Sequence, residues 1–384
     1  MDSTPAHGTG AHDDDLAPAH LAAAWRGTRP PRALVHLDSA AAGRSSRAVL
    51  AATAAHALRE AEVGGYVAAA GAADVLERAR DDVRALLGWP AGEGVVAFVH
   101  GAGDALVQLL LSWPGGAPAT AAHAPGEYGP NTALLHRVGV APVLVPGPHR
   151  LDPAAFERAL AGRRPDLVHV TWVGSHVGTV QPAARVAAVC AAAGVPVVLD
   201  AAQALGHVDT DMGALPPEAD VVVYGTSRKW LAGPRGVGFV AARGPLARRL
   251  GPLEQPEAHV AGRVGLAAAL AEHRELGPAR VRAGLAAVGA AVRRRLADGL
   301  AGSWEVVEDL DEPSATVTLR PAGGAVDLVA LRARLLGDEG VLTTCLGVER
   351  APGEMRAPAL RVSGHLDTTA GDVERLVAAL RRVR

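Results

Sequence analysis

Cysteine, net charge and long apolar segments are all scarce in this sequence, and each shortage excludes a class of protein. Cys190 and Cys345 are the only cysteines in 384 residues, too few for a disulfide framework or a four-thiolate metal site, and we expect no metal. The 38 Lys plus Arg side chains nearly balance 40 Asp plus Glu, which argues against a nucleic-acid partner. No apolar segment approaches about 18 residues, since residues 185–199 are broken by Gly194 and Pro196, so we expect no membrane partner. The N-terminus lacks the basic and apolar regions of a signal peptide, and we expect a cytoplasmic protein.

Lysine is scarcer still, because all 38 basic side chains except Lys229 are arginines. The richness in Ala, Gly, Arg and Pro is typical of a GC-rich genome, in which arginine replaces lysine wherever any cation suffices. Lys229 is then either a chance survivor or a position that needs an amine able to lose its proton. Arginine cannot do so, whereas lysine acts as a nucleophile, a Schiff-base partner or a base.

Short segments rich in Val and Leu alternate with Ala-rich helical segments from residue 33 onward. We expect strands at residues 95–99, 167–171, 195–199, 221–224 and 316–319. We expect helices at residues 104–111, 153–161, 183–193, 262–300 and 326–336, with a last helix from Ala370. Nearly continuous apolar strands separated by helices predict an α/β protein with a mostly parallel sheet covered on both faces.

The sequence changes character near residue 251, which predicts two domains. Residues 1–31 begin with a segment rich in Ala, Gly, His and Asp that has no periodicity, and we expect a flexible N-terminal segment there. Residues 32–250 carry the alternation of strands and helices and form a large domain. Residues 251–384 form a smaller C-terminal α+β domain.

The loops after the expected strands carry the chemistry, because ligands of an open parallel sheet bind beyond the carboxyl ends of its strands. Residues 100–105, His-Gly-Ala-Gly-Asp-Ala, lead into a helix, and their small side chains suit a phosphate at the helix N-terminus. An ordinary turn is an equally good interpretation of this loop. It is not a dinucleotide fingerprint, because Leu106 stands where the third glycine belongs.

Asp200 and Lys229 each follow an expected buried strand and form a more specific pattern. Asp200 either caps the next helix or pairs with a protonated ring nitrogen, and the alanines after it leave room for a flat ring. Lys229 lies among hydroxyls, a guanidinium and glycines, although a basic surface loop is the alternative interpretation. An aspartate followed 29 residues later by a lysine, both at strand ends, is typical of pyridoxal phosphate enzymes.

The segments LDAAQALGH (199–207) and SRKWLAGPRGVGF (227–239) resemble those of the class V aminotransferase group of fold-type I pyridoxal phosphate enzymes. This group also contains cysteine desulfurases, selenocysteine lyases and isopenicillin N epimerase-like proteins. The resemblance covers residues 32 to 384. It implies a large cofactor-binding domain with a mostly parallel sheet and a smaller C-terminal domain, with pyridoxal 5'-phosphate as the cofactor.

The resemblance also assigns roles to residues around the cofactor ring. Lys229 resembles the Schiff-base lysine, and Asp200 resembles the partner of the pyridine nitrogen. Ala202 would pack beneath the ring, and Gln203 would hydrogen-bond its phenolic oxygen. Tyr128, in the segment GEYGPN, takes the place where many relatives have a stacking histidine, a role that a phenol can also serve.

The phosphate end and one ring contact depart from the pattern of the group. The phosphate is expected beside Ala102, Gly103, Asp104, Thr226 and Arg228. Gly103 replaces a usual hydroxyl residue, and Arg228 stands where histidine is common, so the arginine compensates for one lost phosphate bond. Ser175 stands where an asparagine often contacts the cofactor oxygen, which weakens the assignment of that residue.

Residues 37–46, 60–68 and 257–265 are most similar to the carbon–sulfur lyases of the actinobacterial ergothioneine pathway. This resemblance implies a small amino-acid-derived sulfur substrate, hercynylcysteine sulfoxide, whose C–S bond would be cleaved. Arg361 matches the arginine that binds the substrate carboxylate, for which a bidentate guanidinium is suited, although a surface arginine is the alternative.

The resemblance further implies a homodimer with active sites near the subunit interface. We therefore expect the trimethylammonium end of the substrate to bind aromatic or acidic side chains, with Tyr66, Trp172 and Glu62 as candidates. Ordinary packing and solvated charge are at least as good an interpretation of each candidate singly.

Other activities remain open at this point. A cysteine desulfurase needs a cysteine nucleophile shortly before the carboxylate-binding arginine, and Cys345 lies in that region. Residues 342–346 do not resemble the desulfurase loop, however, so a small buried thiol is the favoured interpretation. A dinucleotide-dependent dehydrogenase would explain neither Lys229 nor Asp200. A catalytically silent relative would keep the fold without turnover.

Overall fold

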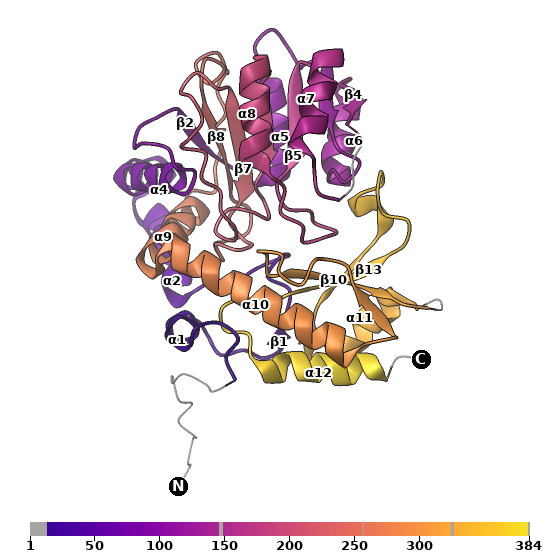
Figure 1. Ribbon diagram of the computed structural model, residues 1–384. Helices are drawn as coiled ribbons and strands as arrows, with labels where there is room; N and C mark the ends of the chain where they lie inside the picture. The colour runs from indigo at the N-terminus through magenta and orange to yellow at the C-terminus, as the bar shows by residue number, and fades with distance from the viewer. Residues whose placement is uncertain (1–13, 146–148, 256, 324–325, 383–384) are drawn as a thin grey trace.

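The computed structural model describes residues 14–145, 149–255, 257–323 and 326–382. The protein is built on a seven-stranded sheet, which Figure 1 shows in its upper part. Across the sheet the strand order is β2-β8-β7-β6-β5-β3-β4. The strands are β2 (Val95–Val99), β3 (Thr120–His123), β4 (Ala141–Leu144), β5 (Leu167–Thr171), β6 (Val197–Asp200), β7 (Val221–Thr226) and β8 (Gly238–Arg243). Strand β8 runs in the direction opposite to that of the other six, so the expected mostly parallel sheet is confirmed.

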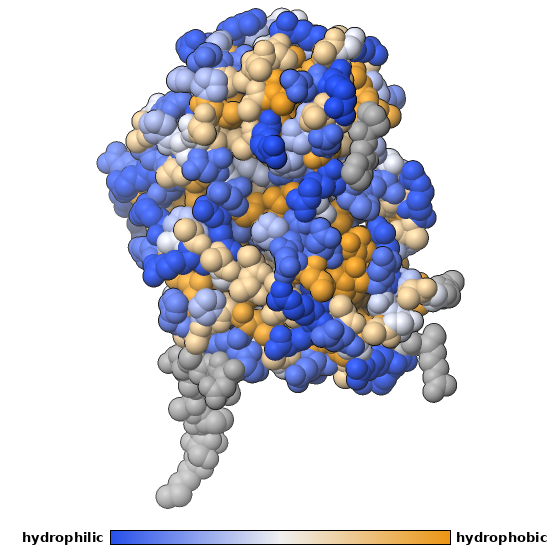
Figure 2. Space-filling view, in the orientation of Figure 1, coloured by the Kyte–Doolittle hydropathy of each residue, from blue (hydrophilic) through white to orange (hydrophobic). Residues whose placement is uncertain are grey.

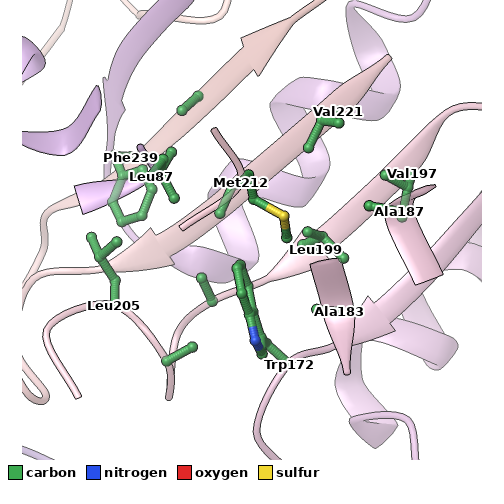
Figure 3. Packing of buried hydrophobic residues seen from close by; sticks show 14 of the residues in the cluster. Leu87, Trp172, Ala183, Ala187, Val197, Leu199, Leu205, Met212, Val221 and Phe239 are labelled. Carbon is green, nitrogen blue, oxygen red and sulfur yellow. The ribbon is translucent and has the colours of Figure 1, made fainter. Parts of the chain in front are cut away.

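Helices cover both faces of this sheet because alternate strand residues point to opposite sides. Val197 and Leu199 of β6 belong to one apolar cluster, and Val198 between them belongs to the other. Figure 3 shows the first cluster from close by. The helices of this part are α2 (Arg47–Val63), α3 (Gly65–Gly71), α4 (Ala73–Leu86), α5 (Ala102–Leu111), α6 (Gly129–Arg137), α7 (Pro153–Gly162), α8 (Ala183–Ala193) and α9 (Val260–Leu276).

A smaller α+β part lies below the sheet in Figure 1. Its four-stranded antiparallel sheet has the order β12-β13-β10-β9. The elements are β9 (Trp304–Val306), β10 (Thr316–Pro321), β12 (Thr344–Leu346), β13 (Ala359–Ser363), α10 (Pro278–Gly299), α11 (Leu328–Gly337) and α12 (Ala370–Arg381). The side chain of Thr369 and that of Asp372 form a capping box that starts α12. In Figure 2, hydrophilic residues cover most of this face, and hydrophobic ones gather near its middle.

The expected flexible segment 1–31 is wrong for the residues that the structure describes. Helix α1 (Ala19–Gly27) buries Leu21 and Trp25 in the core of the small part, and the Trp25 ring stacks on His365 at 3.9 Å. Strand β1 (Val35–His36) then pairs in parallel with β11 (Val341–Leu342). The apolar residues four apart would have indicated this helix, but the surrounding alanines conceal the periodicity. Residues 1–13 lie outside the described residues.

The expected boundary at residue 250 also differs from the structure. Helix α9 packs against α2 and α4, and its Leu266 and Leu270 join the apolar cluster of the large sheet. Gly277, with φ +83°, ends α9, so the single helical region expected at 262–300 is two helices. The large part therefore continues to α9, and the small part combines α1 and β1 with the chain from α10 onward. No helix within the described ranges is both long and apolar enough to cross a membrane.

Candidate active site

A cavity of about 660 Å³ opens at the carboxyl ends of β5, β6 and β7, where the strand-end rule places a ligand. The small part closes its other side with residues of α11, β12 and β13. Eleven of the residues predicted from the sequence line it: Ala102, Gly103, Tyr128, Ser175, Asp200, Ala202, Gln203, Thr226, Arg228, Lys229 and Arg361. The structure thus brings together side chains that lie up to about 260 residues apart in the sequence.

Lys229 lies in the turn directly after β7 and is half-buried at the cavity wall. Burial lowers the pKa of its ammonium from the usual 10.5 to about 7, against the raising effect of Asp200. Arg361, Arg228 and Arg350 lower it further by charge repulsion. The lone lysine is therefore an amine that is substantially neutral near neutral pH, as a nucleophile or base requires.

Asp200 ends β6 and is buried at the base of the cavity. Its Oδ1 accepts a hydrogen bond from the backbone N–H of Ala202 at 2.8 Å. Its Oδ2 accepts one from Nδ2 of Asn131 at 2.8 Å. These two donors fix the plane of the carboxylate, so that it can face a ring nitrogen lying over Ala202.

A buried ion pair behind Asp200 was not found from the sequence. The Nδ1 atom of His169 lies 3.0 Å from Oε2 of Glu127, and its Nε2 lies 2.9 Å from the Tyr224 hydroxyl. Burial would raise the pKa of Glu127, but the charge of His169 and hydrogen bonds from His169 and Thr171 lower it to about 2. Glu127 in turn raises the pKa of His169 despite its burial. Each member of the pair thus favours the charged form of the other, and His169 anchors the phenol of Tyr224 next to Asp200.

Two sequence signals could have indicated this network. His169 is the one imidazole within a fully buried strand, where an unpaired polar group is costly. Glu127 and Asn131 flank Tyr128 in the segment GEYGPN, and both are buried. A buried polar residue beside a predicted ligand-binding residue is expected to hold that residue in position.

The end of the cavity where the sequence predicts a phosphate lies at the N-terminus of α5, where Gly101, Ala102 and Gly103 line the wall. Arg228 and Arg235 also line it, and neither guanidinium has a hydrogen-bond partner among the described residues. Burial, and then the charge of nearby Arg235, lower the pKa of Arg228. Two adjacent guanidiniums without a carboxylate suit a dianion such as a phosphate ester.

The predicted contact of Asp104 with the phosphate is not supported for its side chain. Its carboxylate turns back to accept hydrogen bonds from the backbone N–H of His100 at 2.9 Å and from Gln108 at 3.0 Å. The side chain does not line the cavity, and a carboxylate there would repel a phosphate. Only the backbone N–H of Asp104 remains suited to that role.

The ring region is lined by Tyr128, Ala202, Gln203 and Ser175. One N–H of Gln203 is donated to the Ala40 carbonyl at 2.9 Å, which leaves its second N–H for a ligand oxygen. The Ser175 hydroxyl is buried without a hydrogen-bond partner in the described part of the chain. An unpaired buried hydroxyl facing a cavity fits a polar ligand group, as a cofactor oxygen would be.

Arg361 lies on β13 at the side of the cavity formed by the small part. Its Nη1 donates to the Ser175 carbonyl at 3.0 Å, and its Nη2 lies 3.5 Å from Oδ1 of Asp38. Its Nε is buried and has no partner among the residues described. The guanidinium is thus held in place and keeps a donor for a substrate carboxylate.

The three candidates for the trimethylammonium end lie outside this cavity. Trp172 follows β5 but packs into the apolar core (Figure 3). It is only 2% exposed, so its predicted contact with substrate is wrong. The side chain before it, Thr171, lines the cavity instead, because neighbouring residues point to opposite sides. Tyr66, on α3, is 87% exposed, and Glu62 at the end of α2 is exposed. Neither side chain lines this cavity.

Residues 35–291 match the family model described as aminotransferase class-V. The chain belongs to the class V aminotransferase family. Over 380 residues it is 49% identical to the Mycobacterium tuberculosis protein named "Probable hercynylcysteine sulfoxide lyase", covering 94% of this chain and 93% of that protein. It is 30% identical over 237 residues to a cysteine desulfurase of Klebsiella pneumoniae, covering 58% of this chain and 56% of that protein. Its fold is similar to that of a cysteine desulfurase from Escherichia coli, with a TM-score of 0.75 and 20% identity over 94% of this chain and 98% of that one.

This class V aminotransferase is a pyridoxal phosphate enzyme, so the expected family, fold and cofactor are confirmed. The residues present fit the group. Lys229 would hold the aldehyde through its amine, Asp200 would pair with the ring nitrogen, and Arg228 and Arg235, between β7 and β8, would bind the phosphate. The individual roles of these residues stay predictions.

The lowered pKa of Lys229 predicts how cofactor uptake depends on pH. The attacking amine must be neutral, so the uptake rate of the cofactor-free protein should rise about tenfold from pH 6 to 8 and then level off. The rate of appearance of the visible absorption band measures this, and pyridoxal without its phosphate controls for titration of the phosphate. A rate that still rises steeply above pH 9 would show that Lys229 keeps an ordinary pKa.

Proposed function

We propose that this class V aminotransferase is a pyridoxal phosphate-dependent carbon–sulfur lyase that acts on hercynylcysteine sulfoxide. The proposal is supported by 49% identity, over nearly the whole chain, to a relative bearing that name. One observation carries the chemistry: Lys229, Asp200 and Arg361 line a single cavity, whereas Cys345 does not. An amine base and a carboxylate-binding guanidinium suffice for elimination, which needs no thiol nucleophile.

Three residues of the chain have separate roles in the elimination. Arg361 binds the α-carboxylate and orients the amino acid, so that its Cα–H points toward Lys229. The neutral ε-amine of Lys229 removes the Cα proton. When bound, pyridoxal phosphate supplies an electron sink for the negative charge at Cα. Asp200, held by Asn131 and Ala202, stabilises the protonated ring nitrogen on which that sink depends.

The bond that breaks joins Cβ to the sulfoxide sulfur. The electron pair from the Cα–H bond forms a Cα–Cβ double bond, and the sulfur leaves as a sulfenic acid. Water then converts the three-carbon remainder to pyruvate and ammonia. Reduction of the sulfenic acid to ergothioneine takes two electrons and two protons, which an external thiol supplies with release of water.

The cavity carries more positive charge than one carboxylate and one phosphate require. Arg350 lines it, and its Nη1 donates to the Tyr128 hydroxyl at 3.2 Å. Arg332 lines it as well, with its Nε bonded to the Thr343 carbonyl at 3.3 Å. Hercynylcysteine sulfoxide carries a second carboxylate at its histidine-derived end. These two guanidiniums are positioned to bind it, which favours this substrate over cysteine itself.

A product assay with the purified holoenzyme tests the proposed function. Hercynylcysteine sulfoxide with a thiol reductant should yield pyruvate, ammonia and ergothioneine in equal amounts, whereas free cysteine should be turned over far more slowly. Pyruvate is measured by coupled reduction, and ergothioneine by mass spectrometry. Release of alanine and sulfide from cysteine at a comparable rate would refute the proposal in favour of a desulfurase.

Cys345 provides a second test, because a desulfurase depends on its thiol and a direct lyase does not. Cys345 lies on β12 with its side chain away from the cavity, and burial raises the pKa of its thiol. Its neighbour Thr344 points into the cavity and donates to Asp38 at 2.6 Å. We expect Cys345→Ser to keep at least about half of the lyase rate. Lost turnover with an intact cofactor absorption band would assign the thiol a catalytic role.

We also propose that the enzyme is a homodimer that works in the cytoplasm. The apolar side chains of Leu50, Leu58, Tyr66 and Val67 are 52–87% exposed on α2 and α3, which suits a subunit interface. Both cysteines are unpaired, as is usual in a reducing compartment. In such a dimer, Tyr66 serves the active site of the partner subunit.

Mixing two inactive variants tests the shared site. Lys229→Ala and Tyr66→Ala subunits, each confirmed as folded, should together regain about a quarter of the wild-type activity after exchange, because half of the dimers are mixed and each has one intact site. Full activity of Tyr66→Ala alone, or no recovery of activity after proven subunit exchange, would show that Tyr66 does not serve the partner's active site.

A further inference from the structure

A second, much smaller cavity lies behind the active site, and His149, His176 and Glu354 line it together with the Glu127–His169 pair. Its volume is about 20 Å³, enough for a single ion or water molecule. His149 comes from the segment between β4 and α7, and His176 from the loop after β5. Glu354 comes from the small part, between the 3₁₀ helix η1 (Val348–Arg350) and β13. Three separate segments thus meet at one point.

The ligating atoms of these three residues converge. One nitrogen of each imidazole and one carboxylate oxygen all lie within 4.8 Å of one another. The Glu354 carboxylate contacts both rings, through Oε1 to Nδ1 of His149 and through Oε2 to Nε2 of His176 at 3.3 Å. His176 is 2% exposed, yet neither of its ring nitrogens makes a hydrogen bond of acceptable geometry in the described part of the protein. A buried imidazole without hydrogen bonds that faces a cavity points to a missing ligand.

Glycines keep the space around this cluster open. A Cβ atom at Gly126 would lie 2.2 Å from Oε2 of Glu354. One at Gly174 would lie 2.6 Å from the Val177 carbonyl oxygen and 3.3 Å from Cε1 of His176. Any larger residue at position 126 would therefore displace the carboxylate. The glycine at position 126 thus lets the backbone pass close to the Glu354 carboxylate.

We propose that His149, His176 and Glu354 bind a divalent transition-metal ion, of which Zn²⁺ fits best, with water as the fourth ligand. Two neutral imidazoles and one carboxylate form a common set of protein ligands for Zn²⁺. We expected no metal because cysteine is scarce, but that scarcity excludes only thiolate sites. It does not exclude a site built from histidines that lie far apart in the sequence.

Such an ion would connect the two parts of the molecule beside the active site. His149 and His176 belong to the large part, and Glu354 to the small part. Glu354 follows Arg350 by four residues, and Arg350 contacts Tyr128 at the active cavity. A metal at Glu354 would therefore hold the segment that carries Arg350 in place. This role concerns the structure and does not depend on the identity of the substrate.

Metal analysis of the untagged full-length protein tests the proposal, with Zn²⁺ as the probe. After equilibration with Zn²⁺ and gel filtration, wild-type protein should retain one equivalent more than His149→Ala and Glu354→Gln proteins. His136→Ala removes an exposed histidine of α6 that lies outside the cluster, and it should match the wild type. Zn²⁺ should also raise the melting temperature of the wild type and of His136→Ala, and raise it less in the other two.

The two cluster variants are chosen so that failure to fold does not obscure the result. The His149 side chain is 45% exposed, so its removal leaves no buried cavity, and Glu354→Gln keeps the side-chain volume. Co²⁺ in place of Zn²⁺ should give the visible absorption of a four-coordinate site in the wild type alone among these three proteins. No retained metal, or equal retention in wild type and His149→Ala, would reduce the cluster to an ion pair and overturn the proposal.

Discussion

Lys229→Ala should abolish lyase turnover and the visible absorption band of the bound cofactor. No other lysine exists in the chain to replace the amine. The same side chain acts as the anchor of the cofactor and as the proton acceptor at Cα, so one substitution removes two functions. We expect a fall in kcat of more than about 10³-fold. Steady-state assays and an absorption spectrum of the purified variant measure both effects.

Lys229→Arg is the matched control, because it supplies a long basic side chain that cannot lose its proton. Arginine holds its proton at every accessible pH and cannot attack an aldehyde or accept a proton from carbon. Loss of activity in both variants, with melting temperatures near that of the wild type, would locate the effect in the amine. Substantial turnover by Lys229→Arg would refute the proposed chemistry.

Asp200→Asn should lower kcat by about 10² to 10³-fold while leaving the fold and part of the cofactor affinity intact. The carboxylate accepts hydrogen bonds from Ala202 and Asn131, and an asparagine can still accept one of them. It cannot stabilise a protonated ring nitrogen by charge, so the ring loses most of its capacity as an electron sink. Single-turnover measurement of Cα proton exchange separates this effect from product release.

Tyr224→Phe is the control for Asp200→Asn, because it removes a neutral donor beside the carboxylate and keeps the charge. Burial and the charge of Asp200 hold the pKa of Tyr224 well above its usual value, so the phenol stays protonated. Its loss should lower kcat by less than about tenfold. Equal losses in the two variants would mean that the hydrogen-bond network, and not the charge of Asp200, sets the rate.

Sequence reasoning located the residues whose position follows from strand ends. Asp200 ends β6 and Lys229 follows β7, and the carboxyl ends of parallel neighbours must meet at one edge of the sheet. The prediction was wrong where the role of a residue depends on the direction in which its side chain points. Trp172 and Thr171 are adjacent, yet one enters the core and the other the cavity. The last residue of a strand can be located from the sequence. The face of the sheet to which its side chain points cannot be assigned without the register of the whole sheet.

Contacts between distant segments account for most of what the sequence left out. Glu127 and His169 lie on different elements, and neither belongs to a motif that indicates an ion pair. Glu354 meets His149 and His176 only because the small part folds back onto the large one. The chain from 14 to 31 was expected to be flexible because its apolar partners lie far away in the sequence, near the C-terminus. Composition describes a segment alone and contains no information about its partners.

The pairing of β1 with β11 has a consequence for the order in which the protein acquires its structure. Val35 lies beside Val341, so the first strand emerges from the ribosome about 300 residues before its partner. The intervening chain can form its own sheet during synthesis, while α1 and β1 still lack the residues against which they pack. Closing so long a loop is entropically slow, and docking of the N-terminal segment should be among the last folding events. During that interval Leu21 and Trp25 are exposed, so the nascent protein is most open to chaperones, or to aggregation, at the end that was made first.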